Sequence, residues 1–419
     1  MNPKPLASIL PGLVLAALLN SSALAAAGDW PQWRGPNRDG ISTETGLLKD
    51  WPAGGPPLAW KTTGLGAGFA TVALVGDRIY TSGDVGSENF VIALNRADGQ
   101  KVWSTKLGKA GAPGWGGFAG VRGTPTVTGD HLYAIGQYGE IACFEAASGK
   151  EVWRKHFVDD FGGKLPEWGF SESALVDGDQ VVATPGGPQG AIVALDRKTG
   201  KLLWQSQDFT DEAHYSSIIQ ATIDGVPQYI QLTAASVVGI SPKDGKVLWR
   251  ANRKGATAVI PTPIYHDNHV YVTSGYGIGC NLFKISESGG VFSAEQVYAN
   301  KVIKNHHGGV ILLDGKVYGN GDPLWVCQDF KTGKADWDTR EVGKGAIAYA
   351  DGRFYLREEK QKGSNLVLIE ATPTAYSEKG RFEQPDQSGK QAWAHPVIAG
   401  GKLYVRDQDV LLCYDVRAK

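Results

Sequence analysis

One ten-residue phrase recurs along the chain and constrains its fold more than any other feature. In the clearest copy, residues 195–204, an acidic residue is followed four positions later by Gly and four positions after that by Trp. Related copies occupy residues 94–103, 144–153, 240–249 and 328–337. A second phrase lies between them, in which Gly precedes by four positions a Tyr inside an apolar run. The chain is therefore built from internal repeats.

The spacing of these markers gives the number of repeats. The Trp of the first phrase recurs about every 45 residues, and a period of about 40–50 residues is typical of propeller blades. Including aromatic substitutes, the first series is Trp60, Trp103, Trp153, Trp204, Trp249, Tyr298, Trp337 and Phe382. The second series is Tyr80, Tyr133, Val182, Tyr229, Tyr271, Tyr318, Tyr355 and Tyr404. Both series count eight units.

Each repeat has the pattern of four strands. The first is short, the second carries the Tyr, the third ends at the acidic residue and the fourth carries the Trp. Asp and Gly between the last two strands are typical turn residues. No sustained helical period follows residue 27, so the sequence predicts an all-β, eight-bladed propeller of four-stranded antiparallel blades.

The two ends of the chain carry complementary parts of one repeat. Residues 58–61 resemble a Trp strand without its earlier strands, whereas residues 402–415 supply the second and third strands without a fourth. We therefore expect the N-terminal strand to complete the last blade. Closure of this kind removes the exposed sheet edges that an open array would present.

The segments outside the repeats predict export and a covering loop. Residues 1–27 have a Lys near the start, an apolar core and small residues at a cleavage site, as in a secretory signal peptide. We expect a soluble, monomeric, exported protein in the periplasm or outside the cell. Residues 28–57 are predicted to be a loop segment packed on the propeller, which spans residues 58–419. The net charge of −1 does not favour nucleic acid or anionic membrane as a partner.

The cysteines occupy positions that favour small buried residues. Cys143, Cys327 and Cys413 stand directly before the third-strand ending that carries the acidic residue, where other copies have Ala. Free Cys behaves as a small apolar residue, and equivalent positions in different blades are too far apart for a bridge. We predict no disulfide within the chain, and Cys280 lies outside the pattern.

The mouth of the central channel is the predicted ligand site. Counting back eleven residues from each second-strand marker gives a ring that should line this opening. The ring is Phe69, Arg122, Ser171, Ile218, Ile260, His307, Lys344 and Trp393, with His395 two positions beyond Trp393. It holds three potential cations, two aromatic rings and no acid, which favours a planar, anionic ligand. The alternative is a solvated channel that binds only water.

The remaining polar residues do not predict a metal site or a catalytic site. The histidines lack metal-ligand spacing, so no metal site is predicted. Glu172 is interpreted as a turn or surface carboxylate rather than a general base. No catalytic set of nucleophile, base and orienting acid can be assembled from the spacing of residues.

These repeats resemble those of the pyrroloquinoline-quinone (PQQ) type of β-propeller, from about Trp60 to Asp415. The resemblance implies one of two functions. The first is a binding propeller of the cell envelope for a protein or a small anionic ligand, like the outer-membrane-assembly propellers. The alternative is a quinoprotein dehydrogenase that uses PQQ with calcium to oxidise an alcohol or sugar. Such dehydrogenases carry a disulfide between adjacent cysteines, and no two cysteines are adjacent here.

Overall fold

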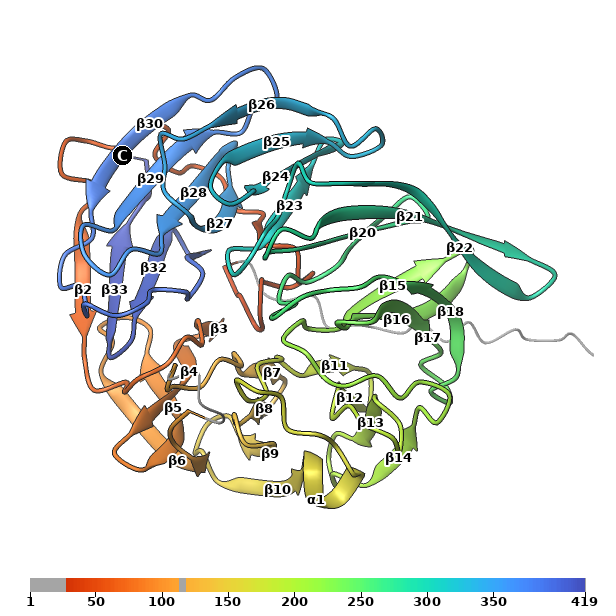
Figure 1. Cartoon of the computed structure of the whole chain (residues 1–419). Helices are drawn as coiled ribbons and strands as arrows, with labels where there is room; N and C mark the ends of the chain where they lie inside the picture. Colours follow the sequence, from red (N-terminus) through yellow and green to blue (C-terminus); the bar gives the residue numbers. More distant parts are fainter. Residues whose placement is uncertain (1–27, 113–117, 419) are drawn as a thin grey trace, which may run out of the picture.

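The chain closes into a ring of eight four-stranded antiparallel blades, as the repeats predict, and one blade gains a fifth, parallel strand (Figure 1). The computed structural model describes residues 28–112 and 118–418. The predicted signal peptide, residues 1–27, lies outside the described residues. Among the residues that are described, no helix is long and apolar enough to cross a membrane. The prediction of an all-β propeller is confirmed.

Blades 1 to 4 follow one another in sequence, each running from an inner to an outer strand (Figure 1). Blade 1 contains β3 (Ala73–Val75), β4 (Arg78–Val85), β5 (Glu88–Asn95) and β6 (Lys101–Lys109). Blade 2 contains β7 (Thr126–Thr128), β8 (His131–Ile135), β9 (Glu140–Glu145) and β10 (Glu151–His156), followed by the short helix α1 (Phe157–Phe161). Blade 3 contains β11 (Leu175–Asp177), β12 (Gln180–Ala183), β13 (Val193–Asp196) and β14 (Leu202–Gln205). Blade 4 contains β15 (Ile219–Ile223), β16 (Val226–Leu232), β17 (Ser236–Ile240) and β18 (Val247–Asn252).

Blades 5 to 8 complete the ring, and two of them include strands from the N-terminal segment. Blade 5 contains β19 (Ile264–His266), β20 (His269–Ser274), β21 (Gly279–Ser288) and β22 (Val291–Asn300). Blade 6 contains β23 (Val310–Leu313), β24 (Lys316–Asn320), β25 (Trp325–Asp329) and β26 (Ala335–Thr339). Blade 7 contains β27 (Gly345–Ala350), β28 (Arg353–Glu358), β29 (Asn365–Glu370) and β30 (Glu378–Glu383), with β1 (Ile41–Ser42) parallel to β27. Blade 8 contains β31 (Val397–Ala399), β32 (Lys402–Asp407), β33 (Val410–Asp415) and β2 (Leu58–Thr62).

The repeated ten-residue phrase forms the contact between neighbouring blades. Asp196 caps its turn by accepting a hydrogen bond from the Thr199 amide at 2.9 Å. Gly200 lies in this turn with φ +69°, and a Cβ there would come within 2.7 Å of Trp153 in the preceding blade. The indole of Trp153 donates to the Arg197 carbonyl in the same turn at 2.9 Å. The same Gly–Trp contact joins Gly149 to Trp103 and Gly245 to Trp204.

The N-terminal strand closes the ring in the predicted way. Strand β2 pairs antiparallel with β33, and Trp60 lies opposite Cys413. Gly99 of blade 1 packs against Trp60, where a Cβ would lie 2.7 Å from the indole. Trp60 therefore joins blade 8 to blade 1 by the contact that other Trp residues make elsewhere. The prediction that β2 completes the last blade is confirmed.

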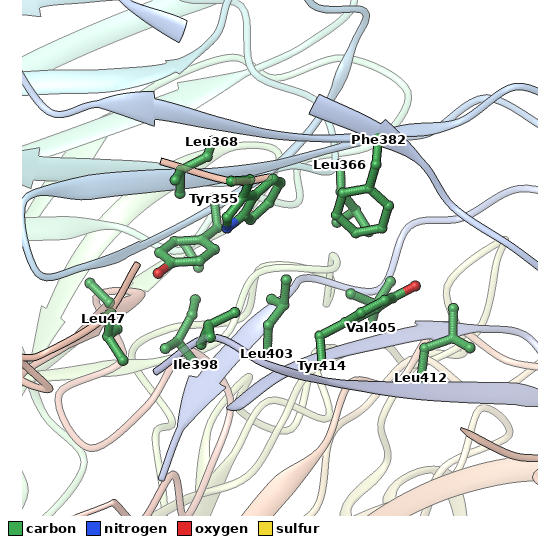
Figure 2. Close-up of a cluster of buried hydrophobic side chains, with 14 residues drawn as sticks. Leu47, Tyr355, Leu366, Leu368, Phe382, Ile398, Leu403, Val405, Leu412 and Tyr414 are labelled. Atoms are coloured by element: carbon green, nitrogen blue, oxygen red, sulfur yellow. The ribbon is translucent and has the colours of Figure 1, made fainter. Parts of the chain in front are cut away.

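The apolar core lies between adjacent blades. At the joint between blades 7 and 8, Leu366 and Leu368 of β29 face Leu403 and Leu412 across a cluster of buried side chains (Figure 2). Leu47 of the N-terminal segment belongs to the same cluster. Burial at about 25 cal/mol per Å² of apolar surface makes such joints the main stabilising contacts of the ring.

Residues 28–57 enter the central opening of the ring before they reach β2 (Figure 1). Two buried arginines hold this segment, each with 4% or less of its surface exposed. Arg38 donates to carbonyls that precede blades 3 and 4, and Arg34 donates to a carbonyl of blade 6. The acceptors are Ser173 (3.1 Å), Ile218 (2.9 Å) and Ala174 for Arg38, and Val310 (2.5 Å) for Arg34.

The four cysteines lie in four different blades, and all are buried and free. Cys143, Cys327 and Cys413 occupy the third strands of blades 2, 6 and 8, as the repeat pattern predicts. Cys280, which the sequence pattern left unplaced, lies at the start of β21, the third strand of blade 5.

Candidate functional site

A cavity of about 170 Å³ lies at the mouth of the central channel. It is bounded by residues that precede the inner strands, by loops on the same face, and by the N-terminal segment. Most of its wall is aromatic: Trp33, Phe69, Phe118, Trp168, Tyr215, Tyr276 and Trp393 all line it. The aromatic surface is the main chemical property of this site.

Four members of the predicted ring form one continuous stacked wall. The Arg122 guanidinium lies over the Phe69 ring, 5.3 Å from its centroid. Phe69 stacks on Trp393 at 4.4 Å, and Trp393 stacks on His307 at 4.1 Å. The structure therefore brings Phe69, Arg122, His307 and Trp393 together around one cavity.

Arg122 is the cation of the cavity. Its side chain donates to the carbonyls of Phe118 at 2.7 Å and Gly120 at 3.1 Å, which leaves three of its five N–H groups without a partner among the described residues. Burial lowers the pKa of Arg122 to about 10, so it remains charged at neutral pH. No carboxylate forms an ion pair with it within residues 28–112 and 118–418.

Lys344 lies beside the cavity but does not line it. Its ammonium group forms an ion pair with Glu359 at 2.9 Å and donates to Nδ1 of His306 at 2.7 Å. Glu359 also contacts Nδ1 of His307 at 3.2 Å. The prediction that no acid neutralises these groups is wrong, because Glu359 reaches them from the end of β28 rather than from an inner strand. Burial alone would raise the pKa of Glu359, but the hydrogen bond from His307 and the charge of Lys344 lower it overall.

The histidines around the mouth are neutral at pH 7. Burial and the neighbouring His307 and Lys344 lower the pKa of His306 to about 2. Burial and the charge of Arg34 lower the pKa of His395 to about 3. Burial also lowers the pKa of His307 below its ordinary value. Of the three potential cations predicted for the ring, Arg122 is the one that is charged and lines the cavity among the described residues.

His395 lies beneath the cavity rather than in its wall. Its Nε2 donates to the His307 carbonyl at 2.8 Å, and its ring packs against Trp33 at 4.6 Å. Trp33 itself forms part of the cavity wall and donates to the Thr262 hydroxyl at 3.0 Å. His395 thus supports the residues that line the site.

The inner-strand register missed the residues that reach the cavity from elsewhere. Trp33 comes from the N-terminal segment, and the other missed rings come from loops between strands: Phe118, Trp168, Tyr215 and Tyr276. The aromatic opening of residues 29–33 was a signal for the first of these. Ile218 of the predicted ring is fully buried, whereas Ser171 and Ile260 do line the cavity. Glu172 is not a surface carboxylate, since only 3% of it is exposed.

The residues at this site do not fit PQQ held with calcium. Calcium takes six to eight oxygen ligands, usually including carboxylates, and no Asp or Glu lines the cavity among the described residues. Across residues 28–112 and 118–418, no group of three or more His, Cys, Asp or Glu side chains is placed to hold a metal ion. The aromatic wall and Arg122 do fit a planar carboxylate without a metal.

The ring of eight PQQ-type blades defines a β-propeller with a candidate ligand site at its mouth. The family model described as outer membrane protein assembly factor BamB matches residues 87–339, more than half of the chain. The chain belongs to this family of PQQ-repeat propellers.

Curated relatives come from two groups. The chain is 30% identical over 139 residues to the outer membrane protein assembly factor BamB of Burkholderia pseudomallei, covering 33% of this chain and 32% of that protein. It is 25% identical over 201 residues to the quinoprotein ethanol dehydrogenase of Pseudomonas putida, covering 42% and 31%. The chain thus matches about a third of the length of either relative.

Solved structures of both groups share the fold. BamB from Moraxella catarrhalis aligns with a TM-score of 0.60 and 13% identity, covering 84% of this chain and 95% of that one. Quinohemoprotein alcohol dehydrogenase from Comamonas testosteroni aligns with a TM-score of 0.65 and 13% identity, covering 94% and 81%. At these identities the likeness concerns the fold alone.

Proposed function

We propose that the protein is a non-catalytic binding propeller of the cell envelope whose mouth binds a flat, anionic small molecule. The observation that carries this proposal is Arg122, a cation with three N–H groups that find no partner in the described part of the chain, at the end of a stacked aromatic wall. Its N–H fork matches a carboxylate, and the aromatic side chains that line the cavity, among them Trp33 and Trp168, offer apolar surface to a planar group. The predicted signal peptide and the relatives named as outer membrane assembly factors support an envelope location.

The charge at the cavity argues against a cationic ligand. Aromatic cages often bind quaternary ammonium groups, but such cages do not place an arginine against the ligand. Glu359, which lies beside the cavity, is already engaged by Lys344 and His307. An anion therefore meets a favourable field in this cavity, whereas a cation meets an unfavourable one.

The donor set of the cavity favours binding over quinone-dependent oxidation. A dehydrogenase of the PQQ type needs the quinone and its metal ion held against the substrate, and the lining residues offer no carboxylate for that purpose. Ser171, Ser173 and Ser217 also line the cavity and provide hydroxyl groups for a polar ligand. These features support a binding site that uses stacking and one charge-assisted contact.

Titration calorimetry of the purified protein tests this function. Naphthoate should bind more tightly than naphthol, because only naphthoate pairs its charge with Arg122. Arg122→Met should weaken naphthoate by about tenfold or more, since a charge-assisted contact contributes roughly 1.5–3 kcal/mol. Arg340→Met, which removes an exposed arginine, is the matched control. Naphthoate that fails to bind, or binds Arg122→Met unchanged, would contradict the proposal. Dye-linked alcohol oxidation with added PQQ and calcium would favour the dehydrogenase.

A further inference from the structure

The hydrogen bonds of His307 determine which of its ring nitrogens carries the proton. Nδ1 lies 3.2 Å from Oε2 of Glu359, whose other oxygen pairs with Lys344 at 2.9 Å. An ionised carboxylate can only accept hydrogen bonds. His307 must therefore present its proton on Nδ1, and Nε2 of the neutral ring is a bare acceptor.

His307 lines the cavity, and 14% of its side chain is exposed. Among the described residues, its ring has a side-chain hydrogen-bond partner only at Nδ1, which leaves Nε2 for a ligand. A ligand that donates a hydrogen bond to this nitrogen should bind more tightly. In a largely apolar cavity, water is the alternative donor to the nitrogen.

The surrounding groups hold His307 in this state. Stacking on Trp393, with planes 18° apart, fixes the plane of the ring. Lys344 favours the ionised form of Glu359 and also donates to Nδ1 of His306, whose ring lies 3.5 Å from that of His307. The charged and titratable groups that face His307 are thus Glu359, Lys344, His306 and Arg122. His307 is therefore a fixed hydrogen-bond acceptor at the cavity rather than a second cation beside Arg122.

We infer that the ligand carries a hydroxyl or N–H group that donates to Nε2 of His307, in addition to the anionic group that Arg122 binds. The inference rests on the proposed function and narrows its ligand class to hydroxy- or amino-substituted aromatic acids. Phe69 and Trp393 lie between Arg122 and His307 in the stacked wall, so the two polar groups belong at different ends of the flat ligand.

A panel of hydroxynaphthoates that differ in the position of the hydroxyl group tests the inference against naphthoate. At least one isomer should bind the wild-type protein about five- to tenfold more tightly than naphthoate, as expected for one additional hydrogen bond. His307→Phe keeps a ring against Trp393 but removes the acceptor. This variant should bind that isomer and naphthoate with equal affinity, because the hydroxyl group then has no acceptor to donate to.

Nitrogen NMR of histidine-labelled, ligand-free protein gives a second readout that a merely structural role would not move. His307 should be protonated on Nδ1 and bare on Nε2, and Glu359→Gln should produce a mixture of tautomers. A proton on Nε2 in the wild-type protein would overturn the inference, whatever the binding results.

The outcomes separate this inference from the proposed function. Naphthoate that binds through Arg122, with no hydroxynaphthoate preferred or with the preference retained in His307→Phe, would overturn the inference and leave the proposed function standing. Failure of every acid in the panel to bind would contradict both.

Discussion

His307 and Trp393 lie face to face, with ring centroids 4.1 Å apart and ring planes 18° apart, although blades 6 and 7 separate them in sequence. Lys344, which occupies the ring position between them, turns away to Glu359 and His306. Lys344 is paired in this way beside the stack and does not line the cavity. Glu359 connects the aromatic wall to the ion pair, because it contacts both His307 and Lys344.

Truncating Trp393 should damage the binding surface more than the fold. Trp393→Ala removes the ring that joins Phe69 to His307 and should weaken naphthoate binding by about tenfold, since aromatic pairs contribute roughly 0.5–1.5 kcal/mol beyond area burial. Trp393→Phe keeps a ring there and should lose about threefold or less. Both affinities can be measured by titration calorimetry. Equal affinity in Trp393→Ala and wild type would show that the ligand does not lie on this wall.

Arg38 should contribute strongly to stability because its guanidinium group donates hydrogen bonds to three buried carbonyl groups. In Arg38→Met the carbonyls of Ser173, Ala174 and Ile218 lose their donors, so we expect the free energy of unfolding to fall by about 3 kcal/mol. The control Arg340→Met alters an exposed residue and should stay within about 0.5 kcal/mol. Denaturant unfolding followed by fluorescence measures both. Similar midpoints for the two variants would refute the anchoring role of Arg38.

Ring closure depends on Trp60. Trp60→Ala removes the side chain that packs against Gly99 of blade 1 and Tyr404 of blade 8, and it should lower the free energy of unfolding by about 3 kcal/mol. Leu58→Ala changes an exposed residue of the same strand, 45% accessible, and should cost less than about 1 kcal/mol. Thermal melts of the two variants make the comparison. A melting temperature of Trp60→Ala equal to that of Leu58→Ala would contradict the role of this joint.

Glu172 should make stability depend on pH. Burial raises the pKa of Glu172 to about 7 from an ordinary value of 4.5, although the Thr184 amide donates to it at 2.7 Å. The folded protein therefore holds this proton more tightly than the unfolded chain does. The contribution of the carboxyl is fully present below pH 4.5 and is lost as the pH rises towards 7.

Glu172→Gln keeps a neutral side chain of the same size at all pH values. Relative to wild type, the variant should gain about 3 kcal/mol of stability between pH 4.5 and a pH above 7, since each pKa unit corresponds to about 1.4 kcal/mol. Chemical unfolding of both proteins across this range gives the difference directly and cancels the other titrating groups. A difference that does not change with pH would show that Glu172 ionises normally in the folded protein.

The sequence predicted the blades because the residues that recur in each repeat are the ones that make the contacts between neighbouring blades. The Gly of each phrase packs against the Trp of the preceding blade, so both markers must recur at a regular spacing. Tyr298 and Phe382, which replace Trp in two repeats, also lie on fourth strands as expected. The complementary chain ends likewise predicted the pairing of β2 with β33. Local pattern and global fold agree in such repeats.

The candidate site was predictable only where it follows the repeat. Phe69, Arg122, His307 and Trp393 share one register and meet at the cavity. Glu359, by contrast, lies just beyond the end of β28, and Trp33 lies outside all repeats. Their approach to the mouth depends on loop paths that no periodic pattern encodes. The charge of the site was therefore overestimated, since the neutralising carboxylate came from a position that the register does not include.

A crystal structure of the protein with naphthoate tests the central claim most directly. We predict that the ligand lies at the channel mouth, with its ring among the aromatic side chains that line the cavity and its carboxylate within hydrogen-bond distance of Arg122. Naphthoate bound at another surface, or bound at the mouth with its carboxylate directed away from Arg122, would contradict it.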